Sequence, residues 1–217
     1  MLTYKIHLIR HGLTQGNLEG RYIGSTDLPL CEAGKAQLLQ LREECEYPQV
    51  DCVYTSPLQR ARQSAEILYP DRQVIPVDGL RELDFGAFEN RDMHDLEKDP
   101  AFQEWVAAGP AACPPGGESG QMLQKRAIEA VAHIFAQMME KRIVSAAVVT
   151  HGGVIMNLLA AMGLPQRPAV AWQLEPGHGF TCLLSAQMWM RDRKFEVYGQ
   201  LPYDGRDYQE AFFADLC

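Results

Sequence analysis

The sequence lacks the features of disulfide-bonded, zinc-binding and membrane-spanning proteins. Its six cysteines, at positions 31, 45, 52, 113, 182 and 217, include no C-x-x-C pair and no regular spacing, which favours reduced thiols over a disulfide framework or a zinc site. The longest apolar stretch, residues 146–164, is interrupted by Thr150, His151 and Asn157, so it does not fit a membrane span. The first residues show no signal-peptide pattern. We therefore expect a cytoplasmic protein with no metal ion and no membrane partner.

Positive charge is also scarce. The 217 residues include 20 Lys and Arg against 28 Asp and Glu, a net charge of −8 with neutral histidines. Proteins that hold nucleic acids through their phosphates normally carry an excess of positive charge, so we expect no nucleic-acid partner. A small anionic substrate is compatible with this balance, because a pocket needs only a few local cations. The oligomeric state is left open, a homodimer included.

Strand patterns alternate with helical patterns along the chain. Strand candidates are residues 4–10, 51–54, 74–77, 145–150, 181–185 and 194–198. Helical spacing covers residues 32–44, 118–142 and 154–162, and in the first of these the apolar face is expected to hold Ala33, Ala36, Leu39 and Leu41. Ser56–Pro57 predicts the start of another helix, which runs to Leu68, because serine caps helices and proline suits the first position.

This alternation predicts an α/β fold in which helices cover both faces of a mostly parallel sheet. Hydrophobic residues make up 47% of the sequence, enough for a sizeable core. We expect a single domain over residues 1–217. Residues 84–117 are interpreted as an insertion over the sheet, where substrate selection could reside.

Two of the apolar strands end in a histidine that is followed by glycine. His11 follows Arg10 at the end of the first strand, and His151 follows the strand at 145–150. Ligands of parallel α/β sheets bind beyond the carboxyl ends of the strands. One such histidine is more often structural, but two in the same context favour a functional site.

Two other segments place charged residues near strand ends. Arg60 lies one turn into the helix that follows the strand at 51–54, so it can face the same edge; a lone helical arginine is usually solvated, and Arg62 is the alternative. Glu82 lies among apolar residues that could bury its carboxyl group. A buried carboxyl can keep its proton near neutral pH and act as a general acid, with Asp84 as the alternative.

Taken in order, these segments resemble the histidine phosphatase superfamily, whose fold is that of phosphoglycerate mutase. The segments that carry the resemblance are residues 8–17 (LIRHGLTQGN), 21–30, 56–65, 82–86, 117–119 and 150–153. The resemblance implies a three-layer α/β/α fold and a covalent phosphohistidine formed on His11, with no metal ion and no cofactor. It also implies that Arg10, Asn17, Arg60 and His151 surround the phosphoryl oxygens, that His151 belongs to the catalytic set, and that Glu82 donates the proton. Leu13 departs from the Glu or Gln of many members, so a polar contact there is lost.

Within this family, the chain resembles the phosphatases more than the mutases. Mutases usually have a longer insertion after the acid and a motif closer to Glu-Arg-His-Tyr-Gly than to ELDFG at 82–86. PGGES at 115–119 resembles the branch that includes α-ribazole phosphatase and broad-specificity phosphatases. We predict a phosphomonoester hydrolase acting on a small phosphorylated metabolite, similar to α-ribazole-phosphate phosphatase. The alternatives are a cofactor-dependent phosphoglycerate mutase and a non-catalytic phosphate-binding module.

The remaining histidines have simpler interpretations. His7 faces away from the reacting end of its strand and is expected to be structural. His94 and His133 share no spacing with acidic or cysteine partners, so they predict no metal site. His178 lies in a turn before a strand and is a candidate for the rim of the site.

Overall fold

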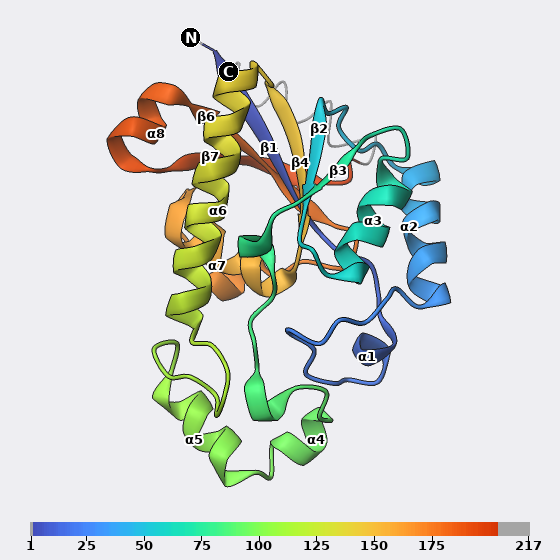
Figure 1. Ribbon diagram of the computed structural model, residues 1–217, viewed down its shortest axis with the longest axis vertical. Helices are drawn as coiled ribbons and strands as arrows, with labels where there is room; N and C mark the ends of the chain where they lie inside the picture. The colour runs from blue at the N-terminus through green and yellow to red at the C-terminus, as the bar shows by residue number, and fades with distance from the viewer. Residues whose placement is uncertain (1, 204–217) are drawn as a thin grey trace, which may run out of the picture.

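A seven-stranded sheet forms the centre of the computed structural model, which describes residues 2–203 (Figure 1). The strand order is β3-β2-β4-β1-β6-β7-β5. The strands are β1 (Thr3–Arg10), β2 (Cys52–Thr55), β3 (Val74–Pro76), β4 (Ser145–Thr150), β5 (Gly163–Leu164), β6 (Gly179–Ser185) and β7 (Phe195–Leu201). β1, β2, β3 and β4 are mutually parallel, whereas β6 runs antiparallel to both β1 and β7.

The register of the two central strands places their carboxyl ends side by side. Arg10 of β1 is paired with Thr150 of β4. His11 and His151, which follow directly, therefore leave the sheet at the same edge. Their proximity is a consequence of parallel pairing, since parallel neighbours end at the same side of a sheet.

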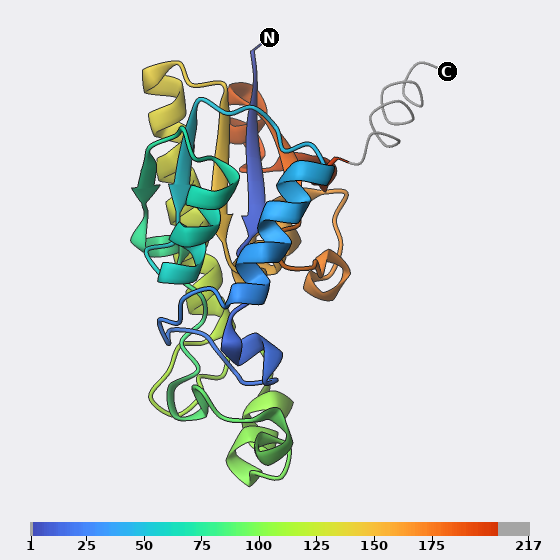
Figure 2. The ribbon, with the colours of Figure 1, turned by 90° about the vertical axis from the view of Figure 1, so that its right-hand side faces the viewer.

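Helices cover both faces of the sheet, and side-chain alternation along β1 supplies both cores. Leu8 packs into a core built with α6 (Gly120–Lys141) and α7 (Gly152–Met162), whereas Ile9 packs into the opposite core with α2 (Glu32–Glu44) and α3 (Gln59–Leu68). The expected three-layer arrangement is therefore confirmed (Figures 1 and 2). The other short helices are α1 (Gln15–Leu18), η1 (Asp78–Leu80), η3 (Ala169–Trp172) and α8 (Ala186–Asp192).

Two local helix predictions were wrong. α3 begins at Gln59 after Leu58 as the N-cap residue, and not at Ser56–Pro57. The Ser56 hydroxyl instead accepts from the Leu58 amide and bonds a histidine of the candidate site.

The predicted apolar face of α2 was wrong for three of its four residues, whereas Leu41 is partly buried against the core. Ala33, Ala36 and Leu39 are exposed, and α2 buries Gly34 and Leu38 instead. Gly34 sets this orientation, because a Cβ there would lie 2.2 Å from the Leu13 carbonyl oxygen.

Residues 84–117 form a small helical unit beyond the carboxyl ends of the central strands. The unit contains η2 (Gly86–Phe88), α4 (Met93–Leu96) and α5 (Pro100–Ala108), and it projects from one end of the molecule in Figures 1 and 2. Its ring contacts join Tyr22, Phe85, Phe88, Phe102 and Trp105. We call residues 84–117 the cap segment.

Membrane-spanning helices, metal-binding clusters and disulfide bonds are the features that the sequence was expected to lack. No helix between residues 2 and 203 is long and apolar enough to cross a bilayer. Over the same residues, no group of three or more His, Cys, Asp or Glu side chains is placed to hold a metal ion. The five cysteines there are free thiols, and Cys217 lies outside the described residues.

Candidate active site

His11 is fixed by the turn that follows β1. Its Nδ1–H donates to the Gly12 carbonyl oxygen at 2.6 Å, and because a carbonyl only accepts, Nε2 keeps its lone pair. The Gly12 amide donates to the Ser64 hydroxyl at 2.9 Å, which in turn donates to the Arg60 carbonyl at 2.6 Å. The turn that orients the imidazole is therefore fastened to α3.

His151 faces His11 from the end of β4, where it is the N-cap residue of α7. The two ring centroids are 5.0 Å apart, with an angle of 65° between the ring planes. His151 Nε2 lies 2.8 Å from the Ser56 hydroxyl, whereas its buried Nδ1 has no hydrogen-bond partner within residues 2–203. A buried ring nitrogen without a partner is costly unless a ligand satisfies it.

Two guanidinium groups lie around the histidines. Arg60 is 1% exposed and donates to the carbonyls of Thr26 at 2.7 Å and Gly24 at 2.6 Å. Arg10 donates to the Leu174 carbonyl at 2.6 Å. The Nε atoms of both arginines are buried without a partner in the described part of the chain. Both guanidiniums therefore keep N–H groups that an anion could accept from.

The loop that holds Arg60 is itself held by Glu89 of the cap segment. Glu89 Oε1 accepts from the backbone amides of Ser25 at 2.8 Å and Phe85 at 3.0 Å. Its Oε2 accepts from the amides of Gly24 and Thr26, both at 3.2 Å, and from the Thr26 hydroxyl at 2.5 Å. One carboxylate thus fixes the backbone whose carbonyls orient Arg60.

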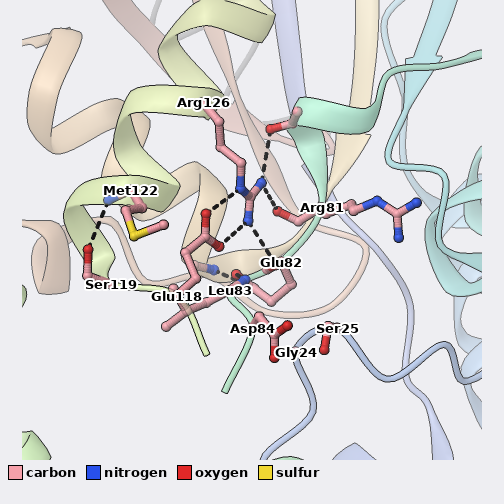
Figure 3. A network of polar contacts seen from close by, with 12 residues as sticks. Gly24, Ser25, Arg81, Glu82, Leu83, Asp84, Glu118, Ser119, Met122 and Arg126 are labelled. Carbon is pink, nitrogen blue, oxygen red and sulfur yellow. Dashed lines mark hydrogen bonds and ion pairs between the residues drawn. The ribbon is translucent and has the colours of Figure 1, made fainter. Parts of the chain in front are cut away.

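Glu82 lines the same cavity as His11. Its Oε1 accepts from the Leu83 amide, and its Oε2 accepts from the Gly153 amide, both at 2.9 Å. Gly153 permits this approach, because a Cβ there would lie 2.4 Å from Glu82 Oε1. The backbone around Glu82 is held by Arg126 of α6 (Figure 3).

Burial sets the protonation of the two histidines. It lowers the pKa of His11 and of His151 well below the usual value, and the positive charge of Arg60 lowers both further. Both rings are therefore neutral at pH 7. A neutral imidazole with a free lone pair at Nε2 is the form that can attack an electrophile.

The Glu82 carboxyl responds to the same burial in the opposite sense. Burial raises the pKa of Glu82, while the amides of Leu83 and Gly153 and the charges of Arg60 and Arg10 oppose the rise. A carboxyl whose pKa is raised holds its proton to a higher pH than an exposed one, as a general acid must.

A cavity of about 320 Å³ opens above these groups. Its lining combines catalytic candidates with apolar and amide side chains: Arg10, His11, Asn17, Ile23, Glu82, Gly152, Gly153, Met156, Gln173 and Leu174. Arg60 and His151 lie beneath this lining, fully buried. Asn17 completes the capping box of α1, in which Thr14 is the N-cap residue. The Asn17 Oδ1 accepts from the Thr14 amide and hydroxyl, so its side-chain nitrogen is the group that could donate to a ligand.

The structure thus brings together all the site residues that the sequence suggested, apart from His178. His178 lines a neighbouring cavity of about 350 Å³ that shares Gln173 and Leu174 with the first. His7 is buried between the hydroxyls of Thr181 and Ser145, away from the cavity lining.

Sequence reasoning missed the residues that fix the positions of the site residues through hydrogen bonds. They are Ser56, Ser64, Glu89, Glu118 and Arg126. Each acts on a backbone group or on a partner distant in sequence, so no local pattern marks its role. Only the serines and Glu118 fell within segments that carried the family resemblance.

Comparisons with a family model, with related sequences and with solved structures all lead to the same family. The family model described as histidine phosphatase superfamily (branch 1) matches residues 6–188. The adenosylcobalamin/alpha-ribazole phosphatase of Escherichia coli K12 is 31% identical over 179 residues, which cover 80% of this chain and 86% of the relative. A probable phosphoglycerate mutase GpmB of Klebsiella pneumoniae is 36% identical over 132 residues, 59% of this chain and 61% of the relative. The crystal structure of the alpha-ribazole phosphatase from Shigella flexneri has a TM-score of 0.73 at 26% identity, covering 84% of this chain and 92% of that one.

Proposed function

The chain belongs to the histidine phosphatase superfamily and is a phosphatase of that type, and from this premise we propose that its cavity hydrolyses a phosphate monoester through a phosphohistidine on His11. Arg10, Asn17, Arg60 and His151 bind the phosphoryl oxygens in this proposal, and Glu82 is the proton donor. The observation that carries it is the His11 ring, which donates from Nδ1 to Gly12 and so presents Nε2 to a pocket of unpaired donors.

In the first step, the lone pair of His11 Nε2 forms a bond to phosphorus as the ester P–O bond breaks. The departing alkoxide takes the proton of the Glu82 carboxyl group. In the second step, water attacks phosphorus, Glu82 takes back a proton, and the N–P bond breaks to release inorganic phosphate. Because the same carboxyl acts first as acid and then as base, one residue serves both steps.

The cations around His11 supply the electrostatic part of catalysis. A phosphate monoester is close to a dianion at pH 7, and the guanidiniums of Arg10 and Arg60 offset that charge while a neutral imidazole approaches. Donors fixed before the substrate arrives need no reorganisation during the reaction, which is the main source of such stabilisation. The unpaired Nδ1 of His151 fits the same role, because a bound dianion favours protonation of that ring.

The proposal extends to the substrate, the partners and the cellular location. We propose a small metabolite monophosphate similar to α-ribazole phosphate, supported by the phosphatase relatives and by a cavity of about 320 Å³. The mutase alternative has weaker support, since that similarity spans 61% of the mutase relative. Free thiols and a net charge of −8 support a cytoplasmic protein that binds no nucleic acid. A homodimer remains part of the proposal.

The first experiment is hydrolysis of p-nitrophenyl phosphate by the wild type and by His11→Ala. Turnover is expected to fall by about 10⁴-fold or more, as for other covalent nucleophiles. Quenching with alkaline detergent during turnover is expected to trap a phosphoryl group on the wild type only, stable in base and released by acid, as expected for a phosphohistidine. No wild-type turnover, with phosphate esters still bound, would indicate the binding module instead.

A panel of metabolite monophosphates then addresses specificity. It includes α-ribazole phosphate, sugar phosphates, nucleotides and phosphoglycerates. Highest kcat/KM on α-ribazole phosphate is the expected result. Interconversion of phosphoglycerates faster than their hydrolysis would establish the mutase instead.

A further inference from the structure

We propose that Arg126, oriented by Glu118, is a positioning residue that aims the Glu82 carboxyl at the leaving group. This inference rests on the proposed function of Glu82 as proton donor. Neither Arg126 nor Glu118 lines the cavity, and the Arg126 guanidinium is already engaged by three backbone carbonyls and by Glu118. Their effect on the reaction passes through the backbone on either side of Glu82.

The guanidinium of Arg126 holds three backbone carbonyls, one in η1 and two in the loop that follows it. Nη1 donates to Arg81 O at 2.6 Å and to Gly79 O at 3.1 Å, and Nη2 donates to Glu82 O at 2.9 Å. The carbonyls of residues 81 and 82 belong to the peptide units before and after the Glu82 Cα. Arg126 therefore fixes both peptide planes that set the direction of the Glu82 side chain (Figure 3).

The loop after η1 carries Glu82 outside any helix or strand. Residues 81–85 connect η1 to η2 and belong to neither element. Buried backbone carbonyls need a hydrogen-bond partner, and a planar guanidinium can serve several at once. The guanidinium comes from α6, a long helix packed on the sheet. Its hydrogen bonds therefore fix the position of the loop relative to that helix.

Glu118 orients the guanidinium. Its two oxygens accept from Arg126 Nε and Nη2, both at 2.7 Å, in a bidentate pair. The Arg126 and Glu118 side chains are 25% and 15% exposed, so solvent has little access to the pair. The Glu118 amide also donates to the carbonyl of Asp84, two residues after Glu82, at 2.9 Å.

The carboxyl end of Glu82 is held independently by α7. The amide of Gly153, two residues after His151, donates to Glu82 Oε2, and His151 faces the nucleophile. The proton donor is thus fixed at its backbone by α6 and at its carboxyl by α7. Loss of the α6 contacts leaves the carboxyl bond but frees the peptide planes, which tilts the acid relative to His11.

The test compares Arg126→Met with Arg81→Met on two kinds of substrate. Arg81 is the matched control, because its side chain points away from the network and, among residues 2–203, pairs with exposed Asp78. With an alkyl phosphate, whose leaving group needs a proton, Arg126→Met is expected to lower kcat about 100-fold, the usual effect of a small misplacement. With p-nitrophenyl phosphate, whose leaving group departs as an anion, we expect a loss of about threefold. Arg81→Met should change both rates by less than about twofold.

Two further readouts separate positioning from folding and from charge. The inhibition constant of inorganic phosphate is expected to stay within about twofold in Arg126→Met, because the phosphate-binding groups are untouched. Arg126→Lys keeps the positive charge near His151 but cannot hold three carbonyls and a carboxylate, so it is expected to show the same substrate-dependent loss. Glu118→Gln, which weakens one side of the bidentate pair, should give a smaller loss of the same kind.

An equal loss on both substrates in Arg126→Met and Arg126→Lys would overturn the inference. Full rescue by Arg126→Lys would do so too, since charge alone would then suffice. Glu82→Gln serves as the reference. If Glu82→Gln itself shows no dependence on the leaving group, the proposed role of Glu82 fails; if it does and the Arg126 variants do not, only the positioning role fails.

Discussion

The two sides of the candidate site are built in different ways. The side that holds phosphorus consists of residues at strand ends and in α3, with Arg60 and His151 fully buried beneath the cavity. The side that we assign to the leaving group consists of loop residues around Glu82. The backbone of this loop is fixed by the Arg126 side chain in place of regular sheet pairing.

This difference matches the chemistry of each side. The phosphoryl group is the same in every monoester, so a rigid sheet edge can be specialised for it. Leaving groups differ between substrates, and loops on a rigid scaffold tolerate the variation that selects among them. Variants on the phosphorus side should therefore affect all substrates alike, and variants on the other side should discriminate among leaving groups.

The largest effect is expected from Arg60→Ala. Loss of a buried, fixed donor to the phosphoryl oxygens should lower kcat/KM by about 10³-fold on alkyl and aryl phosphates alike. Arg62→Ala, an exposed arginine on the same helix, should stay within about twofold. Steady-state kinetics on both substrate types make the comparison. Equal losses in the two variants would show that Arg60 is not the specific phosphate-binding arginine.

Glu82→Gln should show the opposite pattern. We expect about 10² to 10³-fold loss on alkyl phosphates and less than about tenfold on p-nitrophenyl phosphate. Because the pKa of Glu82 is raised, the wild-type rate on alkyl phosphates should fall as pH rises through that pKa, and the variant should lack this limb. A mild effect here with a strong one in Asp84→Asn would make Asp84 the acid.

Glu89→Gln sharpens the comparison, because Glu89 lies in the cap segment but serves the phosphorus side. Weaker contacts to residues 24–26 should loosen the carbonyls that hold Arg60. We expect about a tenfold loss in kcat/KM that is equal for all leaving groups, with a similar rise in the inhibition constant of phosphate. Glu104→Gln, at an exposed position in α5, is the control. A loss confined to alkyl phosphates would contradict this assignment.

His7→Gln tests whether a buried histidine outside the site affects stability alone. Burial and nearby Lys5 lower the pKa of His7 to about 4, against 6.5 in the unfolded chain. The unfolded chain therefore binds the extra proton between these values, and stability present above pH 6.5 is lost as pH falls toward 4. His7→Gln should reduce that loss by about 2.4 kcal/mol, measured by urea unfolding at pH 4.5 and at pH 7. An unchanged pH dependence would refute the buried, neutral state.

Sequence reasoning located the strands and the residues at their ends because both depend on local patterns. Alternation along residues 4–10 and the apolar run at 145–150 define strands, and the histidines follow them directly. The N-terminus of α3 and the buried face of α2 were misjudged, since tertiary contacts decided them. Ser56 is engaged by His151, and Gly34 packs on the Leu13 backbone.

Glu89 and Arg126, which fix the backbone around the site, could not be predicted for a related reason. Glu89 lies more than 60 residues from the loop it fixes, and Arg126 lies 44 residues from Glu82. A glutamate or arginine on a helix or loop is ordinarily solvated, and nothing in the local sequence distinguishes these two. Their roles follow from backbone carbonyls and amides, whose positions only the folded chain defines.

The backbone bonds that join the two ends of the cap segment have an evolutionary consequence. Glu118 donates to the Asp84 carbonyl, and Ala87 donates to the Pro115 carbonyl, so the segment leaves and re-enters the domain at one place. Because the closure cost of a loop grows only slowly with its length, the intervening residues can be lengthened, shortened or exchanged at little energetic cost. Variation in the segment could then alter substrate selection while the reaction chemistry is inherited, provided that Glu89, which fixes the loop holding Arg60, is kept.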